Sequence, residues 1–510
     1  MVCGTTSDAG KSFVVAGLCR LLARRGVRVA PFKAQNMALN AAVTTDGAEI
    51  GHAQWVQAVA AGVEPEAAMN PILLKPTGER TSQLVVMGRA VGVRTAAEYH
   101  RLAPGLLPVV LDALDDLRDR FDVVVCEGAG GAAEINLLDV DVVNLPLARA
   151  AGMPAVVVGD IDRGGVFASL YGTVALLPPD LRECVRGFVV NKLRGDPALL
   201  GGATIDLENR SGVPTLGVLP MAGPDEVADV DNEDSLALDR PGAGPVGHDG
   251  RQLDVAVLRW PRVANAGDVD PLRLEEGVSV RWVRSQGELG RPQLVVLPGS
   301  KDTRGDLAWF RATGLADAVE RSGAAVVAVC AGLQMLGERI DDPGGVEGPP
   351  GSDDGLGWLP VVTEFRDDKV LDRPAGTAVA GPGAGHPVDG YRIHHGRVTA
   401  GPGAAAWLVD DGGTPLGWWR GRAAGTTLHG LFERDRFRSA VLAWAAARAG
   451  VHRAPGGLDF RAARQARLDR IADLVEAHLD IARVEALIAE GAPAASPGTP
   501  RPVRLSPGAP

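Results

Sequence analysis

The sequence has few aromatic residues, no excess of positive charge and no long hydrophobic run. Phe, Trp and Tyr make up 4% of the 510 residues, which disfavours recognition of nucleic acid by base stacking. Lys and Arg number 52 against 63 Asp and Glu, for a net charge of −11. Such a chain lacks the surface that neutralises a phosphate backbone, so we expect no nucleic-acid partner. No apolar run approaches the ~18 residues of a membrane span, so we also expect no membrane partner.

The cysteines are few, odd in number and widely spaced, and no two of the five form a CxxC pair. This pattern indicates neither a disulfide framework nor a zinc knuckle, and it favours a reducing, cytoplasmic location. A glycine-rich loop begins at Gly4, which leaves no room for a signal peptide. The strand before that loop is unusually short, and we therefore expect the native chain to start further upstream.

What the sequence does contain is an alternation of short Val-rich runs with helical patterns, typical of buried parallel strands joined by helices. It predicts an α/β fold with a doubly wound parallel sheet, and a second α/β series after a Gly- and Pro-rich stretch. At about 150 residues per domain the length suggests about three domains, but the patterns indicate two. The expected segments are an α/β domain at 1–237, a linker at 238–251, a second α/β domain at 252–450, a helical extension at 451–490 and a disordered tail at 491–510.

The segment GTTSDAGKS, residues 4–12, lies between a short strand and an apolar helix. Glycines let backbone N–H groups converge on a polyphosphate, Lys11 neutralises it, and the Ser12 hydroxyl can bind Mg²⁺. A plain glycine turn would not explain strand, GKS and helix together. The loop is one residue longer than GxxxxGK[ST] and resembles the amidoligase and dethiobiotin synthetase branch of P-loop proteins. The expected nucleotide-binding residues, for ATP, are Gly4, Thr5, Asp8, Gly10, Lys11, Ser12 and Asn191.

Acidic residues at or beyond other strand ends are candidates for the metal and substrate sites, because open α/β sheets bind ligands there. Since Mg²⁺ takes one or two carboxylates beside phosphate oxygens, we expect Ser12, Asp46 and Glu127 as its ligands. Glu49 could equally be a solvated loop charge and receives less weight. Asn191 could read a nucleotide base. A possible substrate or phosphate edge consists of Asp160, Asp162 and Arg163. Taken singly, these residues could instead form a turn, a surface ion pair and a strand cap.

A buried strand, residues 324–329, runs into a tight turn at Cys330 and then into a helix. This is the architecture of a nucleophile elbow, in which the turn exposes the side chain. Gly299 and Ala331 are expected to donate N–H groups to an oxyanion, and His429 to act as the base for the thiol. The alternative is an inert core cysteine. The strand-to-helix turn, the earlier PGS and the later LHG together resemble a class I glutamine amidotransferase domain, which releases ammonia from glutamine.

Two residues depart from that pattern. Ala328 stands where the usual elbow has its first glycine, and Leu431 stands where the usual HxE has its glutamate. The third member of the triad is therefore unassigned, and Glu433 is not chosen for it. His394 and His395 could serve either binding or structure.

The motifs GTTSDAGKS, PFKAQNMALN, EGAGGAAEINL, DIDRGGVFA, LPGSKDT, CAGLQMLG and LHGLF, in this order, resemble the cobyric acid synthase family of cobalamin biosynthesis over about residues 2–445. The resemblance implies ATP- and glutamine-dependent amidation of a corrinoid, adenosylcobyrinic acid a,c-diamide, at side chains b, d, e and g. The nearest alternative is cobyrinic acid a,c-diamide synthase, which PFKAQNMALN and AEINL disfavour. A ParA-like nucleotide switch is the alternative from another class, but a switch has no use for Cys330 and His429.

Overall fold

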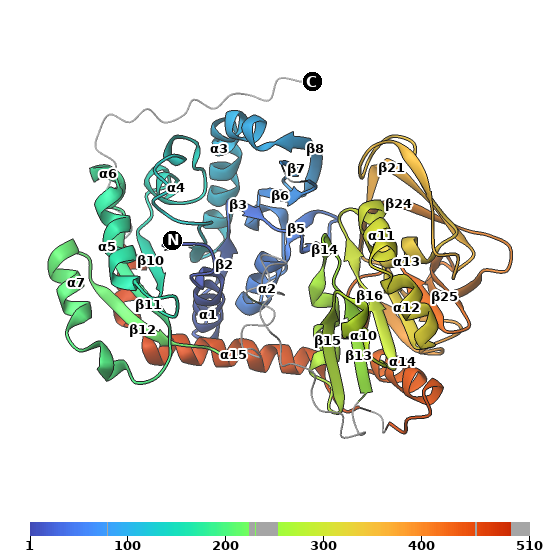
Figure 1. Cartoon of the computed structure of the whole chain (residues 1–510). Coiled ribbons are helices and arrows are strands. Elements are labelled where there is room, and N and C mark those ends of the chain that lie inside the picture. Colours follow the sequence, from blue (N-terminus) through green and yellow to red (C-terminus); the bar gives the residue numbers. More distant parts are fainter. Residues whose placement is uncertain (79, 224–229, 231–252, 454–455, 491–510) are drawn as a thin grey trace.

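A computed structural model of the chain describes residues 1–78, 80–223, 230, 253–453 and 456–490. The expected linker and tail lie outside the described residues. The described chain forms two α/β domains that stand side by side, and the long helix α15 (Phe460–His478) runs along the base of the first domain as far as the edge of the second (Figure 1).

The first domain is built on parallel strands in the order β1 (Val2–Gly4), β10 (Ala155–Asp160), β11 (Val185–Leu193) and β12 (Thr215–Pro220). A second parallel pair, β2 (Val29–Phe32) and β9 (Val123–Cys126), joins β1 through a parallel bridge between Val2 and Glu127. Strands covered by helices on both faces need apolar side chains on both sides, which explains their continuous Val runs. The predicted α/β class with a parallel sheet is confirmed.

Smaller elements of the first domain face the second domain. A four-stranded sheet has the order β3 (Gln35–Met37), β6 (Ile72–Pro76), β7 (Thr81–Val86) and β8 (Arg89–Thr95), and a hairpin joins β4 (Ala41–Val43) to β5 (Glu49–Gly51). The helices are α1 (Lys11–Arg24), α2 (His52–Ala61), α3 (Ala96–Arg120), α4 (Leu145–Ala150), α5 (Val166–Leu176), α6 (Pro179–Arg182) and α7 (Ala203–Ser211).

The second domain centres on a sheet with the strand order β15-β13-β16-β18-β27-β26-β25-β22-β23. Its pairs are parallel from β15 to β27 and antiparallel beyond. The strands are β13 (Leu253–Leu258), β15 (Val278–Val283), β16 (Leu294–Leu297), β18 (Ala325–Val329), β22 (Ala375–Ala378), β23 (Pro387–Asp389), β25 (Ala405–Asp410), β26 (Pro415–Arg420) and β27 (Ala423–Thr426).

A smaller sheet of this domain, in the order β20-β19-β21-β24, leans towards the first domain. Its strands are β19 (Arg339–Asp342), β20 (Gly351–Asp354), β21 (Val361–Asp372) and β24 (Arg392–Ala400), and a short pair consists of β14 (Val263–Ala264) and β17 (Gly299–Ser300). The helices are α9 (Asp270–Arg273), α10 (Gln286–Leu289), α11 (Thr303–Ala312), α12 (Leu315–Ser322), α13 (Ala331–Leu336) and α14 (Asp435–Arg448).

Helix α15 comes from the C-terminal extension but belongs to the core of the first domain. Its buried Leu468, Ile471 and Val475 share one hydrophobic cluster with residues of α1. A Cβ atom added to Gly17 of α1 would lie 2.5 Å from Val475 Cγ2, so the two helices approach as closely as a glycine allows. The chain then pairs Leu479 with Gly217 of β12 and continues into α16 (Ile481–Glu490). The chain thus returns to its first domain.

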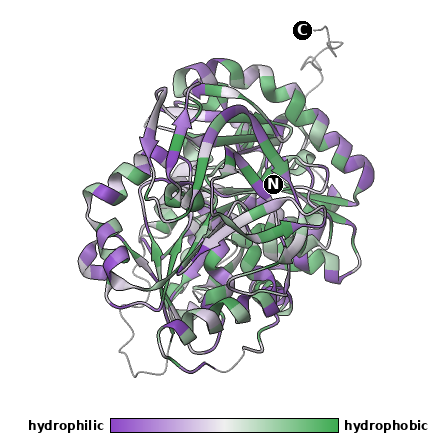
Figure 2. Ribbon diagram, turned by 90° about the vertical axis from the view of Figure 1, so that its right-hand side faces the viewer, coloured by the Kyte–Doolittle hydropathy of each residue, from purple (hydrophilic) through white to green (hydrophobic). Residues whose placement is uncertain are grey.

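Hydrophobic residues concentrate on the strands and the inward helix faces, and hydrophilic residues on the outer turns of the helices (Figure 2). Among the helices of the described residues, none combines the length and the hydropathy that crossing a membrane requires.

Candidate active sites

The glycine-rich loop connects β1 to α1 in the geometry expected of a phosphate site. Gly10 has φ +96°, and a Cβ atom there would lie 2.0 Å from Asn191 Nδ2, so only glycine fits. The Lys11 ammonium is folded over the loop, where it donates to the carbonyl oxygens of Thr6 (3.1 Å) and Gly130 (3.2 Å). The loop leads into the N-terminus of α1, which begins at Lys11, and the unpaired N–H groups of a helix N-terminus favour a bound phosphate.

Glu127 follows β9 and touches the beginning of α1. Its Oε1 accepts hydrogen bonds from Ser12 Oγ and from Lys33 Nζ, both at 2.9 Å, and its Oε2 accepts one from Gln57 Nε2. The Glu127 side chain is fully buried. Burial alone would raise the pKa of this carboxyl, but the Lys33 ammonium and the Gln57 amide hold it below its ordinary value. Glu127 is therefore a permanent negative charge beside the Ser12 hydroxyl.

A magnesium ion fits this donor set, because Mg²⁺ is bound by one or two protein oxygens together with phosphate oxygens. Ser12 and Glu127 supply such oxygens. Among the described residues no group of three or more His, Cys, Asp and Glu side chains forms a complete metal site. Asp46 lies on the exposed turn between β4 and β5, where it accepts a hydrogen bond from Thr44. No contact within the described chain joins Asp46 to Ser12 or Glu127, and its place in the metal shell stays a prediction.

The next strand ends bring further predicted residues to the same edge of the sheet. Arg163 lies 3.2 Å from Asp8 of the loop and 3.5 Å from Asp160, and Asp160 also pairs with Lys192 at 3.1 Å. Asp162 pairs instead with Arg194, at 2.6 Å, away from the loop. Asp160 and Arg163 thus belong to ion pairs that flank the glycine-rich loop, and the role of this group as a substrate or phosphate edge stays a prediction.

Asn191, expected to read a nucleotide base, contacts the glycine-rich loop. Its Nδ2 donates to Ala9 O at 2.9 Å, its Oδ1 accepts from the Lys192 N–H at 2.8 Å, and the side chain is buried. Because both ends of the amide are occupied by backbone, Asn191 braces the glycine-rich loop. Contact of the Asn191 amide with a nucleotide base stays a prediction.

Cys330 occupies the turn between β18 and α13 in a strained conformation. Its φ of 53° and ψ of −110° are unfavourable for a residue with a side chain, and such strain is concentrated at functional turns. The Cys330 N–H is held by Thr426 O at 2.7 Å, and Gly332 lies so close to β16 that a Cβ atom would be 2.3 Å from Leu297 O. Packing of β16 and β27 against the turn and α13 therefore maintains the strained conformation of Cys330.

His429 and Cys330 line the same pocket, and Cys330 is among the groups that shift the pKa of the His429 imidazole. Asp268 contacts the imidazole of His429 at its Nδ1, which lies 2.7 Å from Asp268 Oδ2. The other carboxylate oxygen, Oδ1, accepts the Gly430 N–H at 2.9 Å. Burial alone would lower the pKa of His429, but Asp268 and the Cys330 thiol raise it to about 10. Since a carboxylate occupies Nδ1, Nε2 is the ring nitrogen that remains for the thiol.

Asp268 thus completes a Cys–His–Asp arrangement that the sequence left open. It lies in a short 3₁₀ helix, Ala266–Val269, far along the chain from His429. Glu433, by contrast, pairs with Arg464 of α15 at 2.6 Å. Gly299 lies against the same imidazole, since a Cβ atom there would be 3.2 Å from His429 Cε1. Ala331 begins α13 directly after Cys330. The oxyanion role of Gly299 and Ala331 stays a prediction.

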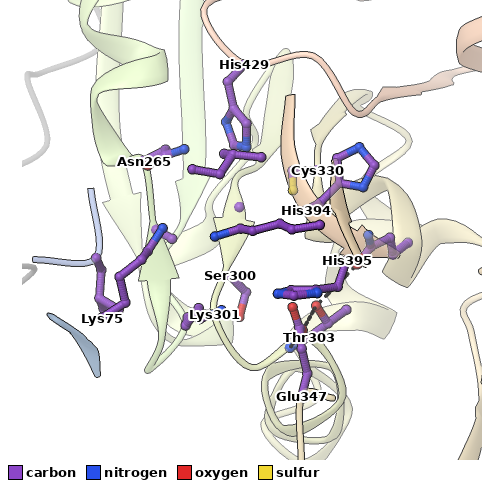
Figure 3. A pocket seen from close by; sticks show the side chains of 16 residues that line it. Lys75, Asn265, Ser300, Lys301, Thr303, Cys330, Glu347, His394, His395 and His429 are labelled. Carbon is purple, nitrogen blue, oxygen red and sulfur yellow. Dashed lines mark hydrogen bonds between the residues drawn. The ribbon is translucent and has the colours of Figure 1, made fainter. Parts of the chain in front are cut away.

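The pocket at Cys330 is built by both domains. Lys75 of β6 and Leu39 come from the first domain, whereas Lys301, Lys369 and Glu347 come from the second. Figure 3 shows Cys330 and His429 at one end of the pocket and Glu347 at the other. Glu49 is buried outside the lining and pairs with Lys75 at 2.7 Å and with Lys369 at 2.6 Å, so it is an interdomain residue and not a solvated loop charge.

The two histidines of β24 have separate positions. His394 lines the pocket near Cys330, and its Nδ1 is 2.7 Å from Gly396 O. His395 faces Gln83 of the first domain, with 3.3 Å between its Nε2 and Gln83 Nε2. Burial lowers the pKa of His394 to about 3 and that of His395 to about 4, so both rings are neutral near pH 7.

Comparison with known proteins assigns both halves of the chain. Residues 1–235 match the family described as "CobQ/CobB/MinD/ParA nucleotide binding domain", and residues 254–437 match the "CobB/CobQ-like glutamine amidotransferase domain". A glycine-rich nucleotide loop in one domain and a Cys–His pair at a strand-to-helix turn in the other define a glutamine-dependent carbon–nitrogen ligase.

Relatives of nearly full length narrow this class. The chain is 52% identical to "Cobyric acid synthase" of Nocardia farcinica, with 98% of each chain covered. It is 51% identical to the protein of the same name from Saccharopolyspora erythraea, over 98% of this chain and 96% of the relative. The chain belongs to the cobyric acid synthase family.

Two solved structures each match less than half of the chain. A "glutamine amidotransferase" covers 39% of this chain and 99% of its own, at 19% identity and a TM-score of 0.29. The "MinD cell division protein" of Aquifex aeolicus covers 48% of this chain and 89% of its own, at 13% identity and a TM-score of 0.26. At these scores the likenesses add nothing to the family assignment.

Sequence reasoning missed Asp268 and the pocket lysines. Asp268 lies in ANAGDVDPL, a segment with no recognisable catalytic pattern. Lys75 belongs to the first domain and Lys369 to the second, far apart in the sequence. They come together at Glu49 only because the two domains pack against each other. Lys301 was visible in LPGSKDT, where a charged residue directly after a PGS turn is the one local signal that could have singled it out.

Proposed function

We propose that this enzyme amidates the corrinoid adenosylcobyrinic acid a,c-diamide at its side-chain carboxylates b, d, e and g to give adenosylcobyric acid. Each amidation would consume one ATP and one glutamine. The observation that carries the proposal is the combination, in one chain, of the loop around Lys11 with the Cys330–His429 pair, supported by full-length relatives named cobyric acid synthase.

In the first domain, the loop N–H groups and Lys11 would bind the ATP phosphates, and Ser12 and Glu127 would hold Mg²⁺. The ion supplies positive charge that neutralises the phosphate oxygens. Lys33 and Gln57 keep the Glu127 carboxylate ionised and fixed in direction. With the phosphates so oriented, a corrinoid carboxylate oxygen attacks the γ-phosphorus, ADP leaves, and an acyl phosphate forms.

In the second domain, the proton of the Cys330 thiol would reside on His429 Nε2 before the attack, and the resulting thiolate sulfur would attack the glutamine carboxamide carbon. Asp268 holds the Nδ1–H of the imidazole and stabilises the imidazolium. The N–H groups of Gly299 and Ala331 would bind the oxyanion. Collapse of the intermediate transfers a proton to the leaving nitrogen and releases ammonia. Water then hydrolyses the thioester to glutamate.

Ammonia must reach the acyl phosphate as NH₃, because the ammonium ion has no free electron pair. The pocket at Cys330 is walled by Leu39 and Lys75 of the ligase domain, which supports a route from the pocket into that domain. His394, which lines the same pocket, carries no proton that it could give to ammonia near pH 7, since its pKa is lowered by burial to about 3.

The decisive experiment is mass spectrometry of the corrinoid after incubation with ATP and glutamine. We expect successive carboxylate-to-amide conversions with the parent protein. Cys330→Ala should abolish them with glutamine and retain them with ammonium, because only the ammonia source is lost. A parent protein that converts no carboxylate, in a preparation where a competent enzyme does so, would overturn the proposal.

A further inference from the structure

The pocket at Cys330 contains more lysine side chains than carboxylates to pair with them. Its lining includes the three lysines Lys75, Lys301 and Lys369 but only one carboxylate, Glu347. Glu49 lies behind the lining and accepts from both Lys75 and Lys369. Three lysine amino groups therefore share two carboxylates, and burial lowers the pKa of Lys369 to about 7 and that of Lys301 below its ordinary value, so the protein alone does not keep both fully charged. Buried charges are normally paired, so the surplus predicts that an anion occupies this pocket in the working enzyme.

Lys301 is the lysine with the least protein compensation. Within the described part of the chain its ammonium makes no ion pair shorter than 4.0 Å, and its one hydrogen bond is to Gln83 Oε1 at 3.3 Å. Burial lowers the pKa of Lys301, while Glu347 is the nearest source of favourable negative potential. An incoming carboxylate would restore the charged form of this lysine.

Glu347 is the corresponding carboxylate, a buried acid without a cation beside it in the described part of the chain. Its Oε2 accepts from the hydroxyl and the N–H of Thr303, at 2.8 and 3.3 Å, and burial raises its pKa. No cation lies within ion-pair distance of Glu347 among the described residues. An incoming ammonium group would compensate this carboxylate as an incoming carboxylate compensates Lys301. One zwitterionic α-amino acid supplies both groups.

His394 supplies a third, independent indication of a ligand. Its Nδ1 faces Gly396 O and must therefore carry the proton, which leaves Nε2 as an acceptor. This Nε2 is buried and has no hydrogen-bond partner within the described structure. The ring stands beside Cys330 in the pocket (Figure 3). An unpaired acceptor there calls for an N–H donor, and the side-chain amide of glutamine has one where glutamate has none.

We propose that Lys301 binds the α-carboxylate of glutamine and Glu347 binds its α-ammonium group, with the side-chain amide nitrogen directed at His394 Nε2 and the carboxamide carbon at Cys330. The proposal rests on the glutaminase half of the proposed function and deepens it. It also has an interdomain consequence. Gln83 of β7, which holds Lys301, belongs to the ligase domain, so that domain helps to build the glutamine site.

The test uses full-length protein, glutamate or acid release as the readout, and three amides. Glutaramate has the α-carboxylate position but no amino group, and 4-aminobutanamide has the amino group but no carboxylate. Lys301→Met should raise KM for glutamine and glutaramate by about 10- to 100-fold, the loss of one charged hydrogen bond, with kcat nearly unchanged. It should leave 4-aminobutanamide unaffected.

Glu347→Gln should give the mirror pattern, with glutamine and 4-aminobutanamide affected and glutaramate spared. Lys301→Arg should recover part of the glutamine affinity. Arg339→Met, which removes an exposed cation of β19, is the matched control and should change none of the three substrates. Ammonium-dependent corrinoid amidation, which bypasses the glutamine pocket, verifies that each variant is folded.

Equal losses with all three amides, or no loss with any, would overturn the assignment of Lys301 and Glu347 while leaving the proposed function intact. A parent protein that hydrolyses no glutamine, yet amidates the corrinoid with ammonium, would overturn the assignment together with the glutaminase half of the proposed function. The crossed pattern supports it, because a merely structural role would not discriminate between substrates by the group they lack.

Discussion

Replacement of Asp268 by asparagine is the sharpest test of the Cys–His–Asp arrangement. In the parent protein Asp268 Oδ2 lies 2.7 Å from His429 Nδ1, and both side chains are almost fully buried. Asparagine has nearly the same shape but carries no charge. Its amide can also donate to Nδ1, which would place the imidazole proton on Nε2, the nitrogen that must accept the thiol proton.

The size of the effect follows from the His429 pKa. Burial would lower this pKa, yet Asp268 and Cys330 together raise it from 6.5 to about 10. That difference corresponds to about 5 kcal/mol in favour of the imidazolium. Loss of one charged hydrogen bond, about 1.5–3 kcal/mol, already costs about 10- to 100-fold in rate. The wrong tautomer adds to this loss, and the equivalent change in a serine-protease triad costs about 10⁴-fold. We therefore expect kcat/KM for glutamine hydrolysis to fall between about 10²- and 10⁴-fold.

The assay is glutamate release by the full-length variant, with ammonium-dependent corrinoid amidation as the check that the ligase domain is intact. Asp341→Asn, which removes a partly exposed carboxylate of β19, is the matched control and should behave as the parent. A loss of less than about threefold for Asp268→Asn, in a folded protein, would refute the idea that Asp268 orients and charges His429.

Three further predictions concern stability. Burial raises the pKa of Asp306 from 3.8 to about 7, so the stability linked to its protonated form is complete below pH 3.8 and is lost as the pH rises through 7. Asp306→Asn should therefore be more stable than the parent at pH 8, by up to about 4 kcal/mol, and this difference should become smaller towards pH 5. Urea unfolding at both pH values measures the difference in free energy of unfolding. A difference that does not depend on pH would contradict the prediction. Gly17→Ala should destabilise the protein by about 1–3 kcal/mol because the new methyl group would meet Val475, whereas Gly172→Ala, in α5 with no atom within 4 Å, should stabilise it by about 1 kcal/mol. Equal changes in Tm for these two variants would argue against close packing of α1 on α15. Lys33→Met should cost about 3–5 kcal/mol because it leaves the Glu127 carboxylate buried without its ion-pair partner, and a loss below 1 kcal/mol in chemical denaturation would show that Ser12 and Gln57 suffice.

The parts of the fold that the sequence predicts are those specified by local patterns. Val-rich runs identified parallel strands, and the glycine-rich loop and the turn at Cys330 were placed correctly at strand-to-helix junctions, because each depends on a few consecutive residues. The positive φ angles at Gly10 and Cys330 belong to tight turns, and such turns can be recognised from the neighbouring residues in the sequence.

Other features depend on residues that meet only after folding. Asp268 reaches His429 across 161 positions, and Glu49 meets Lys369 across 320. An aspartate or lysine at such a position looks like any surface charge in the sequence. Asn191 illustrates the converse, since its position at a strand end was correctly located but its partner, Ala9 O, could not be anticipated. Position along a strand is encoded locally, whereas the partner of a polar side chain is not.

The docking of α15 on α1 has a consequence for biosynthesis. The helix α1 is synthesised before the second domain, yet its apolar face is covered by Leu468, Ile471 and Val475, which are synthesised after that domain. During translation the apolar face of α1 therefore stays uncovered until α15 has been synthesised. The nucleotide loop at the start of α1 would then reach its final stability only after the glutamine-hydrolysing domain exists, so a truncated chain would not leave a stable ATP-consuming fragment without its ammonia source.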